Sequence, residues 1–161
     1  MGEYKASEDA LDGSGMRVAV VAGRFNDHVT APLLEGALGW LDGHGVPRAG
    51  VPVYWVPGAF EIPLVAKRLA ESGEIDAVVC LGAVIRGGTP HFEYVAGECA
   101  AGVSRAALDT GVPCAFGVLT TDDLDQAQAR AGGAEGNKGE EAAATAVEMV
   151  HLLRALGKDG G

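Results

Sequence analysis

The feature that most constrains the fold is a set of four short apolar runs, most of them rich in β-branched residues. Such runs are typical of strands that are buried on both faces. We expect these strands at Arg17–Ala22, Val51–Val56, Ile75–Leu81 and Cys114–Leu119. A segment with helical periodicity follows each run, and this alternation predicts parallel pairing through right-handed crossovers. The sequence therefore predicts an α/β fold in which helices cover both faces of a four-stranded parallel sheet.

One helix is expected after each strand, and one more at the C-terminal end. The first has apolar positions from Val29 to Leu41, and Pro32 predicts that its first turn lies close by. In the last helix, Asn137 and Glu140 form a capping-box-like start. The remaining helices are expected at Phe60–Leu69, Pro90–Leu108, Asp122–Ala131 and Asn137–Leu156.

The first 15 residues are polar, small and without periodicity. We expect residues 1–15 to form a flexible N-terminal arm, or an edge strand that is supplied to a neighbouring subunit. Neither a repeat nor an internal linker interrupts the remaining chain. Residues 16–161 are therefore expected to form a single domain.

Charge and cysteine content exclude several classes of function. Asp and Glu number 22 against 12 Lys and Arg, and the net charge of -10 repels nucleic-acid backbones. The longest uncharged stretches, such as Ala49–Phe60, are too short to cross a membrane, and the first residues lack the apolar run of a secretory signal. Cys80, Cys99 and Cys114 lie in apolar segments without a CxxC motif, as is typical of buried free thiols. We expect a cytoplasmic protein that binds neither nucleic acid nor membrane.

A ligand site in a parallel α/β sheet is expected beyond the carboxyl ends of the strands. Gly82–His91 is the most informative of these strand ends. Gly87 and Gly88 offer free backbone N–H groups, Thr89 is a good N-cap, and Pro90 is a good first helical residue. Such a turn is an anion site or, more simply, a loop that caps a helix. It matches neither the dinucleotide-binding nor the P-loop pattern.

Several side chains at these strand ends have both a functional and a structural interpretation. His91 is a candidate proton-transfer group or a surface residue, and Phe25 either stacks on a planar ligand or packs on the next helix. Glu61 is a candidate ligand-binding carboxylate or a helix cap. Arg86 and Arg130 are candidate phosphate partners or surface arginines. The sequence shows no metal-binding constellation, so no metal is expected.

Five motifs, in order, resemble those of the 6,7-dimethyl-8-ribityllumazine synthase family. The resemblance as a whole runs from about Arg17 to Leu156, which is nearly the whole chain. The motifs are Phe25-Asn26, VPGAFEIP (Val56–Pro63), GAVIRGGTPHFEYV (Gly82–Val95), FGVLTTDDLDQAQARAG (Phe116–Gly132) and GNKG (Gly136–Gly139). The resemblance implies a flavodoxin-like three-layer sandwich. It also implies a transferase of riboflavin biosynthesis that uses no cofactor.

The implied reaction condenses 5-amino-6-(D-ribitylamino)uracil with 3,4-dihydroxy-2-butanone 4-phosphate. The amine and the ketone form an imine, phosphate leaves, and the ring closes with loss of water. The resemblance implies that His91 transfers protons. It assigns substrate binding to Phe25, Ala59, Phe60, Glu61, Ala83, Val84, Ile85 and Phe116, and phosphate binding to Gly88, Thr89, Arg130 and Lys138.

The resemblance also implies a homo-oligomer, because Phe116 and Arg130 would reach the site from a neighbouring subunit. We expect a pentamer or an icosahedral shell of pentamers, which has the capacity to enclose riboflavin synthase as a partner. Two alternatives stay open at this point. One is a flavodoxin-like module that binds flavin or lumazine without catalysis, and the other is a shell protein without activity.

Overall fold

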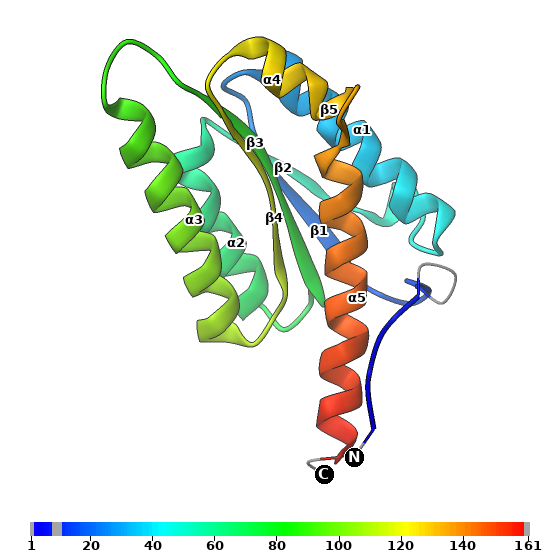
Figure 1. Ribbon diagram of the computed structural model, residues 1–161. Coiled ribbons are helices and arrows are strands. Elements are labelled where there is room, and N and C mark those ends of the chain that lie inside the picture. The colour runs from blue at the N-terminus through cyan, green and yellow to red at the C-terminus, as the bar shows by residue number, and fades with distance from the viewer. Residues whose placement is uncertain (1, 8–10, 160–161) are drawn as a thin grey trace.

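The computed structural model describes residues 2–7 and 11–159 and shows the predicted parallel sheet (Figure 1). The strand order is β2-β1-β3-β4, and all three pairings are parallel. The two central strands, β1 and β3, are buried along almost their whole length, as their continuous apolar runs predict. The strands are β1 (Val18–Gly23), β2 (Val53–Val56), β3 (Ala77–Ile85) and β4 (Cys114–Thr121).

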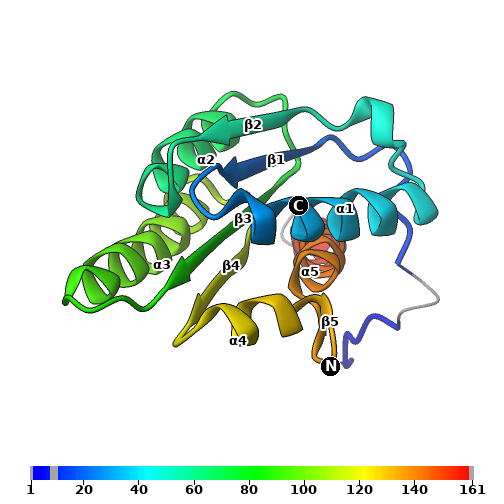
Figure 2. The ribbon, with the colours of Figure 1, turned by 90° about the horizontal axis from the view of Figure 1, so that it is seen from above.

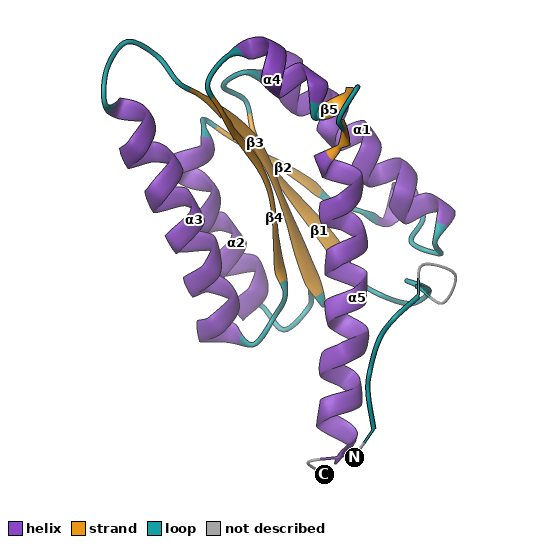
Figure 3. Cartoon of the chain, in the orientation of Figure 1, coloured by secondary structure: helices purple, strands orange, loops and turns teal. Residues whose placement is uncertain are grey.

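Helices cover both faces of the sheet, which confirms the three-layer arrangement (Figures 2 and 3). One face carries α1 (Asp27–Gly43) and α5 (Lys138–Asp159), which pack against each other and against β3. The other face carries α2 (Ile62–Glu71) and α3 (His91–Thr110). The short helix α4 (Leu124–Ala129) follows β4, and the 3₁₀ turns η2 (Arg48–Gly50) and η3 (Ala59–Glu61) flank β2. Each face has its own apolar core.

The third strand is longer than the sequence predicted, and this difference shapes the site. The prediction ended at Leu81 because Gly82 was interpreted as the start of a glycine-rich loop. Gly82 instead lies inside β3, where an added Cβ would come within 3.3 Å of Ile62 Cδ1. The strand continues to Ile85, and its last four residues pair with β4 alone, because the β1 ladder ends at Leu81.

Several other predicted boundaries were wrong, and three of them show a common cause. Helix α1 begins at Asp27, so Pro32 lies inside it rather than near its first turn. Strand β2 begins at Val53, because η2 and a proline precede it. Helix α3 begins at His91 after Pro90, and the Thr89 side chain makes no capping hydrogen bond. In each case the prediction relied on the average preference of a residue type for one position in a helix or strand, and the residue occupies another position here.

The segment between α4 and α5 contains a short hairpin that the sequence did not predict. Its strands are β5 (Ala131–Gly133) and β6 (Gly136–Asn137). The predicted capping role of Asn137 is confirmed, because its Oδ1 accepts hydrogen bonds from Gly139 N (2.9 Å) and Glu140 N (3.1 Å). Its Nδ2 donates to Pro32 O at 3.0 Å. One asparagine thus caps α5 and ties it to α1.

The expected N-terminal arm lies partly outside the described residues. Where it is described, Leu11 and Met16 are buried in the core beneath α1 and α5. Gly13 N donates to His44 O at 2.7 Å, and the His151 ring lies 2.6 Å from Asp12 O. The division at residue 15 stays a prediction, but residues 11–16 lie against the domain.

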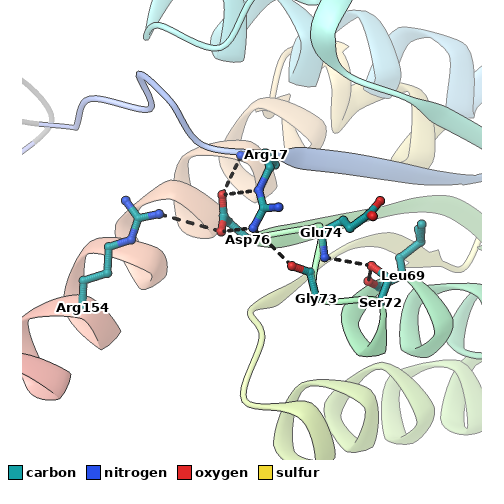
Figure 4. A network of polar contacts seen from close by, with 7 residues as sticks. All are labelled: Arg17, Leu69, Ser72, Gly73, Glu74, Asp76 and Arg154. Carbon is teal, nitrogen blue, oxygen red and sulfur yellow. Dashed lines mark hydrogen bonds and ion pairs between the residues drawn. The ribbon is translucent and has the colours of Figure 1, made fainter.

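A polar network holds the opposite end of the sheet, at the amino ends of the strands (Figure 4). Asp76 accepts a hydrogen bond from Arg17 N at 2.7 Å and forms ion pairs with the Arg17 and Arg154 side chains. Partial burial raises the pKa of Asp76, but the hydrogen bonds and the two positive charges outweigh it, so the pKa is lowered overall. The network joins β1, β3 and α5 far along the strands from the candidate site.

Candidate active site

A cleft of about 670 Å³ opens at the carboxyl ends of β1 and β3, where the sequence places the site. Its walls are the loop after β1, the segment Pro57–Glu61, the end of β3, and the first turns of α3. Nine of the predicted site residues line it: Phe25, Ala59, Phe60, Glu61, Ala83, Val84, Ile85, Thr89 and His91.

Three exposed aromatic side chains line the cleft: Phe25, Phe60 and Tyr94, with 72%, 57% and 69% of their surface accessible. The Phe25 backbone is fixed by a hydrogen bond from its N–H to Pro57 O at 3.0 Å. Below it, Ala83 and Val84 are buried. This arrangement suits a planar ring that inserts between an aromatic face and the edge of a strand.

The exposed edge of β3 is the second component. The last four residues of β3 have a β-ladder partner on one side only. Asn26 occupies part of the other side, because its Nδ2 donates to Ala83 O at 3.1 Å. Asn26 has a left-handed backbone (φ 64°), which asparagine tolerates better than most residues. Backbone groups of successive strand residues face opposite neighbours, and Val78 and Arg86 donate toward β4, so the Val84 N–H and C=O face β4 as well. The backbone groups of Ala83 and Ile85 face the open side, and those that Asn26 leaves free can bond to a ligand.

The third component is the glycine turn that leads into α3. Among the described residues, no hydrogen bond is formed by the backbone N–H of Gly87, Gly88 or Thr89. These donors lie next to the positive end of a 20-residue helix, and this combination attracts anions. His91, the first residue of that helix, is exposed and lines the same cleft. The candidate proton-transfer residue and the candidate anion-binding turn therefore lie side by side.

The remaining predicted residues do not line the cleft of this chain. Phe116 lies in β4, half-buried against the core under α2 and α3. Arg130 ends α4, and its Nη1 donates to Gln126 O at 3.0 Å. Lys138 begins α5 on the other face of the sheet. Gly88 is in the turn but does not contribute to the lining.

The sequence analysis assigned no role to several cleft residues. Tyr94 and Val95 follow His91 by three and four positions, so helical periodicity places all three on one side of α3. That periodicity was a usable signal, as was the tolerance of asparagine for a left-handed backbone at Asn26. The unassigned lining residues are Asn26, Pro57, Gly58, Phe92, Tyr94 and Val95, whereas Gly87 was already a candidate for the anion-binding turn.

The three cysteines take no part in this chemistry. Burial raises the pKa of Cys99 to about 12 and that of Cys114 to about 11, and it also raises the pKa of Cys80. The thiols therefore stay protonated near neutral pH, and none of them lines the cleft. Among the described residues, no group of three or more His, Cys, Asp or Glu side chains is arranged to hold a metal ion.

A second, smaller cavity of about 340 Å³ lies between α3, β4 and α5. Its lining is almost wholly apolar, with Leu108, Pro113, Met149 and Leu153 among its residues. Cys114 is its one titratable side chain, and that thiol is protonated. The cavity thus offers apolar surface but no acid, base or anion-binding group.

Comparison with known proteins decides the family. The sequence model of the 6,7-dimethyl-8-ribityllumazine synthase family matches residues 15–154. The chain belongs to this family. The 6,7-dimethyl-8-ribityllumazine synthase of Syntrophus aciditrophicus (strain SB) is 56% identical over 150 residues, which cover 93% of this chain and 97% of that protein. The resemblance on which the sequence analysis relied is confirmed, and so is the α/β fold that it implied. The cleft is therefore the candidate active site of a lumazine synthase family member.

Proposed function

We propose that the protein condenses 5-amino-6-(D-ribitylamino)uracil with 3,4-dihydroxy-2-butanone 4-phosphate to form 6,7-dimethyl-8-ribityllumazine, phosphate and water. One observation carries the proposal. The same cleft joins an exposed aromatic face, an open strand edge, an anion-binding turn and a histidine. A planar uracil and a phosphorylated ketone need these groups side by side. Membership of the lumazine synthase family supports the same reaction.

The aminouracil binds between Phe25 and the edge of β3. The Phe25 ring stacks on the pyrimidine, and backbone groups of Ala83 and Ile85, which face the open side of β3, bond to its polar edge. The Ala59–Glu61 turn contacts the ribityl chain, with Glu61 as the hydroxyl acceptor. Small or buried side chains at the end of β3 leave room for the ring. This arrangement directs the reactive amine toward the glycine turn.

The butanone phosphate binds with its phosphate at the turn formed by Gly87, Gly88 and Thr89. Backbone N–H groups and the α3 dipole stabilise the dianion, first as a substituent and then as the leaving group. His91, the first residue of α3, follows Thr89 by two positions and moves protons during imine formation and phosphate loss. Much of the acceleration comes from holding two substrates in one cleft, since proximity alone lowers the barrier substantially.

A second copy of the chain completes the site. Phe116, Arg130 and Lys138 lie away from the cleft of their own chain, so they act in the cleft of a neighbour. Such a head-to-tail contact closes into a ring, and the protein is a pentamer or an icosahedral shell of pentamers. Large exposed apolar side chains support assembly; they include Leu64, Tyr94, Leu108 and Leu156, besides Tyr54 and Trp55 on the edge strand β2.

Location in the cytoplasm is part of the same proposal, because the described cysteines are free thiols, as is usual in a reducing compartment. Among the helices of the described residues, none has the length and apolar character that a membrane span requires.

Subunit mixing tests the shared site. His91→Ala and Arg130→Ala variants are each made, unfolded together and refolded as a mixture, with each refolded alone as a control. If the two residues serve the same site from different subunits, some mixed sites carry both wild-type residues, and the mixture is more active than the average of the two. Activity equal to that average, with mixed oligomers verified by mass spectrometry, would contradict the shared site.

A further inference from the structure

We propose that Arg86 is a positioning residue that fixes the conformation of the Gly87–Thr89 turn, and that it is not a ligand of the substrate phosphate. This inference deepens the proposed function and rests on it. Arg86 follows the last residue of β3 and directly precedes the turn. An arginine beside an anion site is ordinarily expected to bind the anion itself. Its contacts here point to a different role.

The Arg86 side chain is already committed to two carboxylates. Its Nη1 donates to Glu93 Oε1, and its Nε donates to Asp122 Oδ1 at 3.0 Å. Glu93 belongs to the first turn of α3, and Asp122 follows the last residue of β4. The hydrogen bond from Arg86 lowers the pKa of Glu93, so this carboxylate stays ionised. Together the three side chains carry a net negative charge, which gives Arg86 no excess positive charge for a phosphate.

The remaining contacts tie Arg86 to the wall of the cleft. The guanidinium carbon lies over the Phe92 ring, 4.3 Å from its centre, and the Arg86 backbone N donates to Thr121 O at 2.8 Å. Phe92 lines the cleft, whereas Arg86 does not. One residue therefore joins the end of β3, the end of β4 and the first turn of α3.

The turn itself has little else to hold it. A Cβ at Gly87 or Gly88 would meet nothing within 4 Å, so neither glycine is packed against the protein. Among the described residues, the backbone N–H groups from Gly87 to Thr89 have no hydrogen-bond partner. A turn of this kind has many accessible conformations, and few of them point all of its N–H groups at one phosphate. Arg86 fixes both ends of the turn and so reduces that freedom.

Arg86→Met tests the proposal, because methionine keeps an unbranched apolar side chain but removes the guanidinium that forms the bridge. We expect the KM for 3,4-dihydroxy-2-butanone 4-phosphate to rise about tenfold. The KM for the aminouracil and the kcat at saturation should change by less than about twofold. Arg86→Lys should also show a raised KM for the butanone phosphate, because the lysine ammonium cannot both bridge two carboxylates and lie flat on a ring. Full rescue by lysine would overturn the bridging role.

Arg48→Met is a matched control. Arg48 forms an exposed ion pair with Glu35 at 3.0 Å, and its side chain is 47% exposed against 44% for Arg86. It lies in η2, away from the cleft. We expect both KM values to stay at the wild-type level. If Arg48→Met raised the KM for the butanone phosphate as much as Arg86→Met does, loss of any surface ion pair would have this effect, and the positioning role of Arg86 would be overturned.

The double variant Glu93→Gln/Asp122→Asn separates positioning from direct binding, since the two roles predict opposite signs. Binding of inorganic phosphate is measured by calorimetry. If Arg86 positions the turn, the double variant releases its side chain and binds phosphate more weakly, even though two negative charges have been removed. If Arg86 is a phosphate ligand that the carboxylates restrain, binding becomes tighter, and the proposal is overturned. Unchanged binding would overturn it as well.

Phosphate calorimetry also keeps the inference separate from the proposed function. A wild-type protein that binds phosphate and loses this binding in Arg86→Met, yet forms no lumazine, would refute the reaction and support the role of Arg86. A protein that forms lumazine with the same KM in Arg86→Met would refute the role and support the reaction.

Discussion

Replacement of Gly139 by alanine should destabilise the protein, although alanine is the better helix former. Gly139 lies in the first turn of α5, where the helix crosses α1. A Cβ at this position would lie 2.0 Å from the carbonyl oxygen of Leu33 and 2.7 Å from its carbonyl carbon. Both are backbone atoms of α1, so no side chain can rotate away. The two helices would have to separate by about 1 Å, since non-bonded carbon and oxygen atoms need more than about 3 Å.

The magnitude follows from two opposing effects. Overpacking of this kind costs about 1–3 kcal/mol, and contact with rigid backbone places it at the upper end. The gain in helix propensity from glycine to alanine offsets about 1 kcal/mol. We expect a net loss of about 2 kcal/mol in the free energy of unfolding. The separation would also strain the hydrogen bond of Asn137 to Pro32 O.

Gly39→Ala is the matched control. Gly39 also lies in a helix, α1, but it is exposed and has nothing within 4 Å of an added Cβ. Alanine should therefore stabilise the protein by up to about 1 kcal/mol. The assay is chemical denaturation at one protein concentration, because the stability of an oligomer depends on concentration. A midpoint for Gly139→Ala equal to or above that of Gly39→Ala, at unchanged slope, would refute the reasoning.

Three further predictions follow from the site and the network. His91→Ala should slow single turnovers by about 10²–10⁴-fold without abolishing them, and an unchanged rate would remove the proton-transfer role. Arg130→Ala should raise the KM for the butanone phosphate far more than that for the aminouracil; an equal rise in both would argue against phosphate as its partner. Asp76→Asn should destabilise the protein by about 1–2 kcal/mol at pH 7 through its contacts with Arg17. The pKa of Asp76 is lower in the folded protein than in the unfolded chain. The stability that Asp76 contributes is therefore complete above the unfolded-state pKa and is lost as the pH falls through the folded-state pKa. Urea titrations should show that the stability difference between wild type and Asp76→Asn shrinks below about pH 4. A difference that grows on acidification would contradict the pairing.

The sheet and its two helical layers could be predicted because burial on both faces leaves a continuous signal. Every position is apolar in two segments, Val18–Val21 and Ala77–Leu81, whereas a segment at the surface would carry polar residues. The boundaries were less accessible. Gly82 has the local preference of a loop, but it pairs with Val118 of β4, which lies 36 positions away, and this pairing makes it a strand residue. Tertiary packing decided against local preference.

The candidate site divides in the same way. Phe25, Glu61 and His91 could be placed together because the carboxyl ends of parallel strands share one edge. The bridge from Arg86 to Asp122 could not, since its partners lie 36 positions apart and nothing in the sequence pairs them. Residues that would act in a neighbouring subunit are the most difficult to predict, because the fold of one chain does not bring them to its own cleft.

Formation of lumazine from the two proposed substrates tests the central claim most directly. The purified protein is incubated with 5-amino-6-(D-ribitylamino)uracil and 3,4-dihydroxy-2-butanone 4-phosphate, and lumazine fluorescence is followed together with released inorganic phosphate. The account predicts that both products appear in equal amounts, faster than in buffer alone, with a lower rate for His91→Ala. A rate equal to that in buffer, from a protein that is folded and assembled, would contradict it, and bound flavin without turnover would show that the cleft binds but does not catalyse.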